Sequence, residues 1–421
     1  MINYNREIIY IKRNLEEKIK KYLETREIIA IVGPRQSGKT TLMKQIFLTL
    51  PSPSVFLDFE DRETLSLFQQ DIKTFAKMYV GGKKFIFIDE FQYAENGGKL
   101  LKYLYDHSPA KFLISGSSSI DITVKTVKYL TGRIFVFELL PLNFDEFLHY
   151  KNDEIYRNFY LPLKENVRVG KLEREKLPDE IHKKIMEFYE EFVLWGGYPR
   201  VHISEDSEER EMVLQNIINT YLLRDIRGLL QLSTEYNLQR LIKSLAFQIS
   251  NLIQYNELSQ TSDLPHISLK KHLKILEQTY ITIFSYPFYT NKRLELVKNP
   301  KIYFLDTGLR NSLIKDFKPL SSRTDKGFLV ENVIATEIYK NGSPLHFWRT
   351  KSKAEVDFII EKGKERISIE VKSSIKTKAG KSLISFIDKY SPERIFVLYP
   401  GNVNKIIYNK KEIYFLPYYF L

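Results

Sequence analysis

One eight-residue segment constrains this 421-residue chain more than any other part of its sequence. It reads Gly33-Pro34-Arg35-Gln36-Ser37-Gly38-Lys39-Thr40 and matches the pattern G-x-x-x-x-G-K-[ST], in which backbone N–H groups and a lysine surround the phosphates of a nucleotide. An apolar run over residues 28–32 precedes it, and a helical pattern starting at Thr41 follows it. This order of strand, loop and helix directs the positive end of a helix at the phosphates. The sequence therefore predicts a nucleotide-binding loop.

Each polar residue of the loop has an expected role. Lys39 reaches the β and γ phosphates, and the Thr40 hydroxyl holds Mg²⁺. ATP and Mg²⁺ are accordingly the predicted cofactors. The predicted nucleotide-binding residues are Gly33, Pro34, Arg35, Gln36, Ser37, Gly38, Lys39, Thr40 and Thr41.

A pair of carboxylates follows a second apolar run. Residues 85–88 are all apolar, and Asp89 and Glu90 come directly after them. Asp89 is expected to take part in holding the magnesium ion, and Glu90 lies where a general base can polarise an attacking water. A strand that simply ends in a solvated acidic turn is the alternative. The pair favours nucleotide hydrolysis over binding alone.

Two further segments carry candidate site residues. Residues 112–115 form the next predicted strand, with hydroxyls at Ser115 and Ser117 where ligands bind in open parallel sheets, so either hydroxyl is a candidate sensor of the γ-phosphate. A plain turn is the alternative for both. Arg133 is a candidate for stabilising the transition state in a neighbouring subunit, which implies a homo-oligomer, and a surface arginine is its alternative.

The region between residues 28 and 140 alternates short β-branched runs with helical stretches. Such alternation is typical of a parallel sheet with helices on both faces. Residues 8–22 carry apolar side chains at helical spacing and predict an amphipathic helix packed on this sheet. The predicted fold class is α/β, with an AAA+-like P-loop NTPase sheet.

Several phrases of the chain together resemble a known family. The phrases GPRQSGKTTL, FIFIDEFQ, LISGSSS, LTGR, PLNFDEF, WGGYPR and YLLRDI, with KIYFLDTGLR and AEVDF nearer the C-terminus, are similar to archaeal and bacterial AAA+-type P-loop ATPases. The resemblance covers nearly the whole chain. It implies nucleotide roles for Lys39, Thr40, Asp89 and Glu90. The sequence departs from the family pattern at the sensor asparagine, where the segment of Ser115 and Ser117 stands instead.

The region after residue 236 predicts a winged helix. Helices are expected over 237–253, 255–262 and 268–278, the last with Ser268 as N-cap, followed by strands over 281–285 and 294–297 around a basic hairpin tip. In the last helix Leu269, Leu273 and Leu276 face inwards and three lysines face outwards. A helix–turn–helix followed by a basic wing is a DNA-docking shape, and a purely structural module is the alternative.

A third constellation lies near the C-terminus. Two strands around Gly363 place Asp357 near the start of one and Glu370 near the end of the next, and Lys372 shares a face with Glu370. Carboxylates so placed can hold Mg²⁺ that polarises a phosphodiester, and a lysine can neutralise the developing charge. With Glu331 on the preceding helix, the pattern resembles the PD-(D/E)XK nuclease fold. A solvated hairpin and a non-catalytic platform are the alternatives.

Composition supports a polyanion partner and excludes several chemistries. The net charge is +12, with an excess of seven positive charges after residue 320, which fits DNA as a partner or a merely lysine-rich surface. The chain has no cysteine, which excludes disulfides, thiolate metal sites and thiol nucleophiles. No apolar run reaches the length of a membrane span, so we expect no membrane partner and a cytoplasmic location.

These patterns together predict a four-part chain. We expect a P-loop ATPase core over residues 1–150, a helical lid over 151–235, a winged helix over 236–320 and a restriction-endonuclease-like α/β domain over 321–421. The predicted function is ATP hydrolysis coupled to DNA binding and Mg²⁺-dependent DNA cleavage. The alternative is a nucleotide-operated switch whose C-terminal parts are non-catalytic docking modules for protein or DNA.

Overall fold

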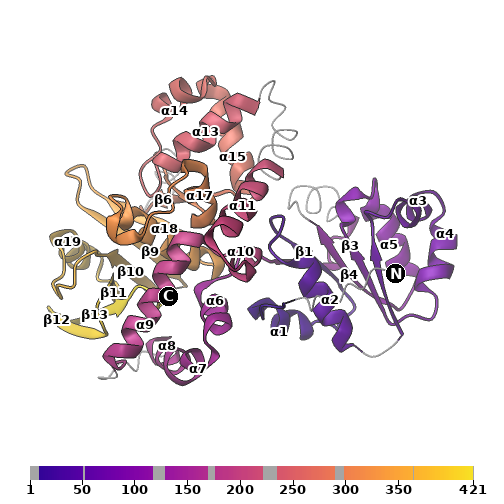
Figure 1. Cartoon of the computed structure of the whole chain (residues 1–421), viewed down its shortest axis with the longest axis horizontal. Helices are drawn as coiled ribbons and strands as arrows, with labels where there is room; N and C mark the ends of the chain where they lie inside the picture. Colours follow the sequence, from indigo (N-terminus) through magenta and orange to yellow (C-terminus); the bar gives the residue numbers. More distant parts are fainter. Residues whose placement is uncertain are drawn as a thin grey trace. The chain divides into compact units, whose positions relative to one another are not determined.

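The computed structural model describes residues 9–50, 53–116, 129–168, 176–220, 235–289, 298–363 and 365–420 (Figure 1). Two compact units divide the chain. The first unit contains Met1–Leu142, Tyr198–Ile203 and Gln278–Tyr280, and the second contains Asn143–Gly197, Ser204–Glu277 and Ile281–Leu421. Within the described ranges, no helix has both the length and the apolar character needed to cross a lipid bilayer.

The first unit is built around a parallel sheet. Its described strands follow the order β2-β3-β4-β1-β5, and every neighbouring pair is parallel. The strands are β1 (Ile28–Val32), β2 (Ser54–Asp58), β3 (Phe85–Asp89), β4 (Lys111–Gly116) and β5 (Ile134–Glu138). The helices are α1 (Asn14–Lys20), α2 (Lys39–Thr49), α3 (Arg62–Gln70), α4 (Ile72–Phe75), α5 (Gly97–His107) and α10 (Pro199–Ile203), with short η1 (Ala76–Val80) and η2 (Phe91–Tyr93).

Helices cover both faces of this sheet (Figure 1). Alternate side chains of a strand point to opposite faces, so Ile29 and Ile31 pack with α1 and α2 on one side. Ala30 and Val32 pack with α3, α4 and α5 on the other side. Because both faces are covered, β1, β3 and β4 are buried along their whole length. The predicted α/β class with a parallel sheet is confirmed.

The second unit begins with helices. The expected helical character of residues 151–235 is confirmed for most of the part that the structure describes, and a role as a lid stays a prediction. The helices up to residue 220 are α6 (Phe144–Lys151), α7 (Asp153–Ile155), η5 (Tyr156–Tyr160), α8 (Leu161–Arg168), α9 (Asp179–Trp195) and α11 (Ser207–Ile217).

A mixed sheet forms the other half of the second unit. Its described strands follow the order β12-β13-β11-β10-β9-β8-β6-β7. They are β6 (Thr282–Pro287), β7 (Lys301–Phe304), β8 (His346–Arg349), β9 (Glu355–Lys362), β10 (Glu365–Val371), β11 (Arg394–Tyr399), β12 (Asn404–Tyr408) and β13 (Lys411–Pro417). The helices after residue 234 are α13 (Glu235–Phe247), α14 (Tyr255–Ser262), α15 (His266–Gln278), α17 (Thr307–Ile314), η7 (Leu320–Ser322), α18 (Lys326–Lys340) and α19 (Lys381–Tyr390).

The segments on the two sides of the predicted boundary at residue 320 share one sheet in the structure. Strand β6, from the segment expected to be a separate winged helix, pairs with β8 from the C-terminal segment. The predicted helices over 255–262 and 268–278 are present as α14 and α15. However, α15 begins at His266, so Ser268 is not its N-cap, and the Ser268 hydroxyl donates instead to the Pro265 carbonyl.

The expected wing is only partly visible. Residues 282–285 form the predicted strand, but they pair with 301–304 in an antiparallel ladder. The expected partner over 294–297 and the basic tip at 290–293 lie outside the described residues. Strand β7 is buried along its whole length, although it is the edge strand of the described sheet.

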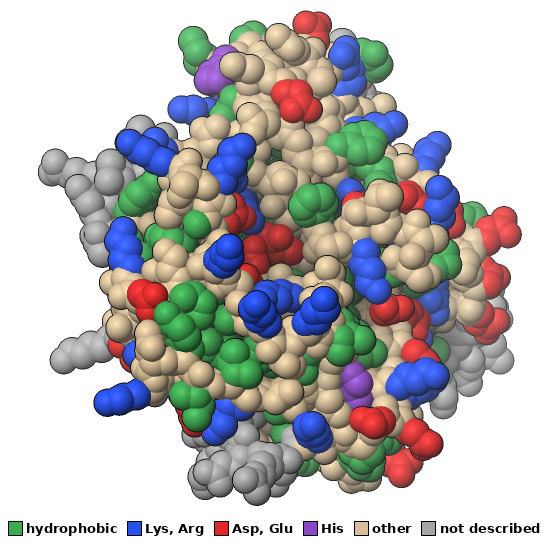
Figure 2. All heavy atoms as spheres, turned by 90° about the vertical axis from the view of Figure 1, so that its left-hand side faces the viewer, with side chains coloured by type: hydrophobic (Ala, Val, Ile, Leu, Met, Phe, Trp, Pro, Cys, Tyr) green, Lys and Arg blue, Asp and Glu red, His purple; other side chains and the backbone are tan. Residues whose placement is uncertain are grey.

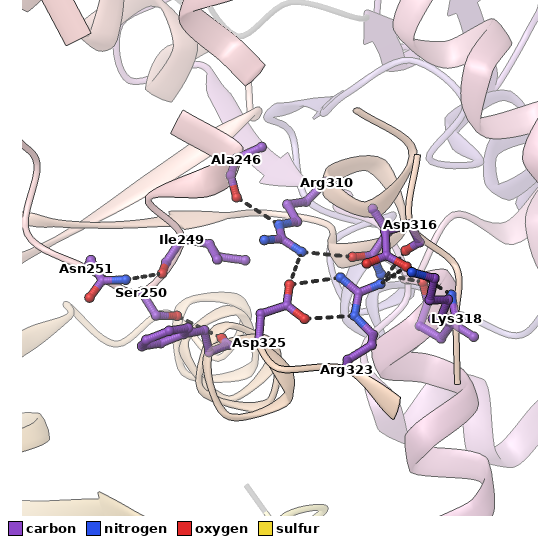
Figure 3. A network of polar contacts seen from close by, with 12 residues as sticks. Ala246, Ile249, Ser250, Asn251, Arg310, Asp316, Lys318, Arg323 and Asp325 are labelled. Atoms are coloured by element: carbon purple, nitrogen blue, oxygen red, sulfur yellow. Dashed lines mark hydrogen bonds and ion pairs between the residues drawn. The ribbon is translucent and has the colours of Figure 1, made fainter. Parts of the chain in front are cut away.

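A buried polar network ties α13, α17 and α18 together within the second unit (Figure 3). Asp325 accepts hydrogen bonds from the guanidinium groups of Arg310 and Arg323, at 2.6 Å and 2.8 Å. Arg310 also donates to the Ala246 carbonyl at the end of α13, at 2.9 Å. Both arginines are buried. Because buried charges are tolerated only when paired, this network fixes the mutual positions of the three helices.

Candidate functional site

The predicted nucleotide loop lies between β1 and α2. Its first residue, Gly33, has a φ of 153°, and a Cβ at this position would collide with the carbonyl oxygen of Leu139. Gly38, which precedes α2, has a φ of 96°. Both positions require glycine, because side chains rarely adopt such backbone angles. The loop therefore has the strand–loop–helix arrangement that the sequence predicts.

Lys39 lies at the first position of α2 and is buried. Its ammonium donates to the carbonyl oxygens of Gly33 and Pro34, at 3.0 Å and 2.8 Å. Burial lowers the pKa of Lys39 to about 8, while the carboxylates of Glu90 and Asp89 oppose that shift. A buried ammonium enclosed by its own loop is placed to exchange these carbonyl contacts for phosphate oxygens.

Asp89 ends β3 at the same edge of the sheet. It is almost fully buried and accepts hydrogen bonds from the Glu90 N–H, at 3.0 Å, and from the Ser115 hydroxyl. Ser115 comes from β4, which lies between β3 and β1 in the sheet. The structure thus shows Ser115 holding Asp89. Its predicted role as a γ-phosphate sensor stays a prediction, and Ser117 lies outside the described residues.

Glu90 follows Asp89 in a left-handed conformation, with a φ of 53°. Burial raises the pKa of its carboxyl group, and the neighbouring Asp89 carboxylate adds to this effect. The Gln92 side chain donates a hydrogen bond to the Glu90 carboxylate. A carboxylate with a raised pKa is a better proton acceptor, which is the property a general base needs.

The donor set of this site fits a magnesium ion. Mg²⁺ prefers oxygen ligands, and the site offers the Thr40 hydroxyl and the Asp89 carboxylate. The Ser37 hydroxyl in the same loop is fully buried and has no hydrogen-bond partner among the residues that the structure describes. A buried hydroxyl without a partner is costly, so an oxygen-rich ligand such as a nucleotide phosphate suits this loop.

Arg13 is a site-supporting residue that the sequence pattern does not reveal. It is buried at the N-terminal end of α1, and its guanidinium donates to the Ser37 carbonyl at 2.7 Å and to the Leu140 carbonyl at 2.5 Å. It therefore connects the nucleotide loop to the segment after β5. In the sequence it is one of several cations around an amphipathic helix, and nothing there marks it as buried.

Arg133 lies away from the nucleotide loop of its own chain. It directly precedes β5, whose parallel neighbour β1 carries the loop at the opposite, carboxyl end. Its guanidinium lies 3.6 Å from the Asp106 carboxylate, and the side chain is 38% exposed. At this edge Arg133 does not reach the nucleotide loop of its own chain. Its expected role in a neighbouring subunit stays a prediction.

The C-terminal hairpin has the predicted geometry. Strands β9 and β10 are antiparallel, and Ile369 pairs with Phe358, so Glu370 and Asp357 are the next residues along the two strands. Asp357 accepts a hydrogen bond from the Val371 N–H at 2.7 Å. The Lys372 ammonium lies 3.6 Å from the Glu370 carboxylate. The hairpin therefore brings these side chains to the same end, as expected.

The expected metal ligands do not form one metal-binding group. Glu331, Asp357 and Glu370 are all described, yet among the described residues no group of three or more carboxylate or histidine side chains is arranged to hold a metal ion. Lys301 on β7 lies beside two of these carboxylates. Its ammonium lies 2.9 Å from Glu331 and 4.0 Å from Asp357, and so fills the position next to these carboxylates.

Burial raises the pKa values of the Asp357 and Glu370 carboxyl groups, and a neighbouring carboxylate adds to the effect at Asp357. Burial raises the pKa of Asp357, and the nearby Glu331 carboxylate raises it further. Burial also raises the pKa of Glu370. For Lys301, burial lowers the pKa, but the carboxylates of Glu331, Asp357 and Glu355 outweigh that effect and raise it overall. Within this group Lys301 forms buried ion pairs with Glu331 and Glu355. The sequence does not reveal them, because Lys301 lies 30 positions before Glu331.

The parallel sheet, the nucleotide loop and the acidic residues after β3 define the first unit as a P-loop domain of the ATPase class. Comparison with known families agrees. Residues 25–148 match a family model described as an AAA domain. Residues 186–320 and 326–420 match two models described only as domains of unknown function, DUF8612 and DUF4143.

Relatives that match most of this chain occur in bacteria and archaea. An "Uncharacterized protein" of Haemophilus influenzae is 25% identical over 399 residues, which cover 90% of this chain and 91% of the relative. A Mycobacterium tuberculosis protein is 24% identical, with 93% and 80% covered. Among solved structures, a Walker-type ATPase of Pyrococcus abyssi is 15% identical with a TM-score of 0.46, and 72% of this chain and 96% of that chain are covered.

Proposed function

We propose that this protein hydrolyses ATP in the first unit, with Lys39, Asp89 and Glu90 as the principal residues. The observation that carries the proposal is their convergence at one edge of the sheet. The carboxylates of Asp89 and Glu90 both act on the pKa of Lys39, although they follow a different strand. The match of residues 25–148 to the AAA domain model supports the same function.

The chain's own residues supply positioning and proton transfer. Backbone N–H groups of the loop and the start of α2 bind the phosphates, and Lys39 neutralises charge on the β and γ phosphates. Glu90 accepts a proton from the water that attacks the γ-phosphorus, and the bond between that phosphorus and the bridging oxygen breaks to release ADP and phosphate. Ser115 keeps the Asp89 carboxylate in place.

Thr40 and Asp89 are the residues that would hold Mg²⁺ here. When bound, the ion neutralises charge on the phosphate oxygens. The direct test is phosphate release from MgATP by the wild-type chain and by Lys39→Ala. We expect hydrolysis by the wild type and none above background by the variant. Equal rates for the two would refute the assignment of this site.

We propose as a second function that the second unit docks on DNA without cutting it. Support comes from exposed lysines at 376, 378 and 381, next to the hairpin that carries Lys372. Figure 2 shows Lys and Arg side chains spread around a recess with acidic side chains on one face of the molecule. Outward-facing Lys270, Lys271 and Lys274 on α15 offer a second set of cations. Such cations bind the phosphate backbone without reading its sequence.

Salt-dependent DNA binding tests this second function. We expect the logarithm of the binding constant to fall linearly with the logarithm of salt concentration, with a slope reduced by about 0.9 for each phosphate contact removed. The test variant replaces Lys376, Lys378 and Lys381 by glutamine. A matched control replaces the exposed Lys73, Lys77 and Lys99 of the first unit and changes the net charge equally. Equal slopes for both variants, or plasmid cutting abolished by Asp357→Ala, would contradict it.

A further inference from the structure

Lys301 is a buried cation shared by several acidic side chains of the second unit. Its side chain is 4% exposed, and its ammonium lies 2.6 Å from Glu355, 2.9 Å from Glu331 and 4.0 Å from Asp357. These contacts join three separate elements. Glu331 lies on α18, Glu355 and Asp357 lie on β9, and the lysine itself comes from β7, at the edge of the same sheet.

The surroundings leave little room for another arrangement of this cation. The Tyr303 hydroxyl donates to the same Glu331 oxygen, at 2.8 Å, and Arg349 pairs with the other oxygen of Glu355 at 3.2 Å. The ammonium also lies 5.7 Å from the centre of the Phe347 ring. Buried carboxylates repel one another strongly unless a cation stands among them. The fold therefore needs a positive charge at this position.

We infer that Lys301 is the resident counter-ion of the carboxylate group formed by Glu331, Glu355 and Asp357, and that it occupies the place of a divalent metal ion. The group then forms without any metal. This inference goes beyond ATP hydrolysis, which belongs to the other unit, and it explains why the second unit carries nuclease-like carboxylates without a metal-binding group. If the inference is right, removal of Lys301 should create a metal-binding site at these carboxylates.

The test removes the internal cation and offers Mn²⁺ alone in its place. We expect Lys301→Met in the nucleotide-free full chain to lower the melting temperature by about 10 °C, because the carboxylates lose their partner. Rising Mn²⁺ should restore most of that loss, since the ion now has three carboxylates to bind. The wild-type melting temperature should not respond to Mn²⁺. In Lys301→Met with Asp357→Asn, the restoration should be much weaker.

A second buried ion pair provides a matched control. Lys340 lies 3.5 Å from Glu337 on the same helix, α18, and both side chains are less than 10% exposed. Lys340→Met should also lower the melting temperature, but its partner Glu337 already accepts a hydrogen bond from the Phe144 N–H, so Mn²⁺ should not restore it. Restoration of Lys340→Met to the same degree as Lys301→Met would overturn the inference, because the metal effect would then be general.

If Lys301→Met fails to fold even with Mn²⁺, Mn²⁺ binding to the wild-type chain tests the inference independently. Electron paramagnetic resonance distinguishes free from bound Mn²⁺ in the nucleotide-free protein. All Mn²⁺ remaining free, or binding that Asp357→Asn leaves unchanged, supports Lys301 as the resident cation. Bound Mn²⁺ that Asp357→Asn removes would overturn the inference, since the metal would then displace the lysine. A folded Lys301→Met variant whose melting temperature does not respond to Mn²⁺ would overturn it as well.

Discussion

The guanidinium of Arg13 donates a hydrogen bond of 2.7 Å to the carbonyl oxygen of Ser37, in the middle of the nucleotide loop. A second bond, of 2.5 Å, joins the same guanidinium to the carbonyl oxygen of Leu140. The loop needs outside support, because Gln36 and Gly38 both adopt positive φ angles. Arg13 therefore acts as a positioning residue, which holds the loop through its backbone carbonyl at Ser37.

Loss of this support should weaken nucleotide binding. We expect Arg13→Met to raise the KM for ATP about tenfold, the equivalent of losing one charge-assisted hydrogen bond of about 1.5 kcal/mol. The kcat should change much less, because Arg13 donates to the backbone carbonyl oxygens of Ser37 and Leu140. Arg13→Lys should recover part of the loss. The control is Lys12→Met, which removes an exposed neighbouring cation and should leave KM unchanged. A fall in kcat alone would contradict this role.

ATP affinity should depend on pH above neutrality. Burial lowers the pKa of Lys39 to about 8 in the nucleotide-free protein, so the side chain is charged below that pH and loses its proton above it. The phosphates require the charged form, and ATP binding above pH 8 must therefore take up a proton. We expect the Kd to be constant below about pH 8 and to rise by up to tenfold per pH unit above it. Calorimetric titration over this range measures the effect.

The control for this prediction is Lys39→Arg. Arginine stays charged throughout the range, so the variant should bind more weakly but show no such rise in Kd. A wild-type Kd that stays flat from neutral pH to about two units above it would contradict the lowered pKa of Lys39.

Replacement of Glu90 should separate ATP binding from ATP hydrolysis. We expect Glu90→Gln to bind ATP with near wild-type affinity and to lose about 10²–10⁴-fold in kcat, because the amide cannot accept a proton from water. Equilibrium binding and phosphate release, measured on the same preparation, distinguish the two effects. Gln92→Ala is the companion variant, and it should cause only a small loss, since Gln92 acts through its hydrogen bond to Glu90. Wild-type turnover by Glu90→Gln would exclude Glu90 as the base.

The network around Asp325 should make the second unit sensitive to acid (Figure 3). Burial raises the pKa of Asp325, but the bonds from Arg323 and Arg310 outweigh it and lower the pKa to about 2. A depressed pKa means that the network contributes stability above the unfolded value near 4, which is lost as the pH falls towards 2. We expect Asp325→Asn to cost about 3 kcal/mol near neutral pH.

Denaturant unfolding at several pH values measures this contribution. The difference in free energy of unfolding between wild type and Asp325→Asn should shrink as the pH falls from about 4 to about 2. Asp153→Asn is a suitable control, because Asp153 pairs with Arg157 on an exposed helix surface, where ion pairs contribute little. A constant difference across the acid range would show that Asp325 does not act through its charge.

Local parts of the site could be predicted because their residues are neighbours in the chain. Strand β1, the loop and α2 form one continuous segment, and Asp89 and Glu90 directly follow the apolar run that forms β3. The pairing of β9 with β10 can be predicted in the same way. The turn at Gly363 and the alternation of side chains set the register that brings Asp357 next to Glu370. In each case short-range geometry was enough.

Contacts between distant segments could not be predicted in this way. Ser115 was expected at the carboxyl edge of the sheet, but only the strand order places its hydroxyl on Asp89. The sequence predicts that 281–285 pairs with 294–297, which lies outside the described residues, and it does not predict the described ladder of 282–285 with 301–304. The β-propensity of residues 282–285 predicts a strand but not its partner, which depends on burial in the larger sheet.

The sequence by itself determined the phosphate-binding loop, the acidic pair at the end of β3 and the alternation that builds a parallel sheet. Only the tertiary structure decided the roles of Arg13 and Lys301. Each is a cation that looks like a surface residue in its own segment, and each is buried by elements far away in the chain. Burial removes water from a charge, so its partners determine what it does, and those partners are set by the fold and not by adjacent residues.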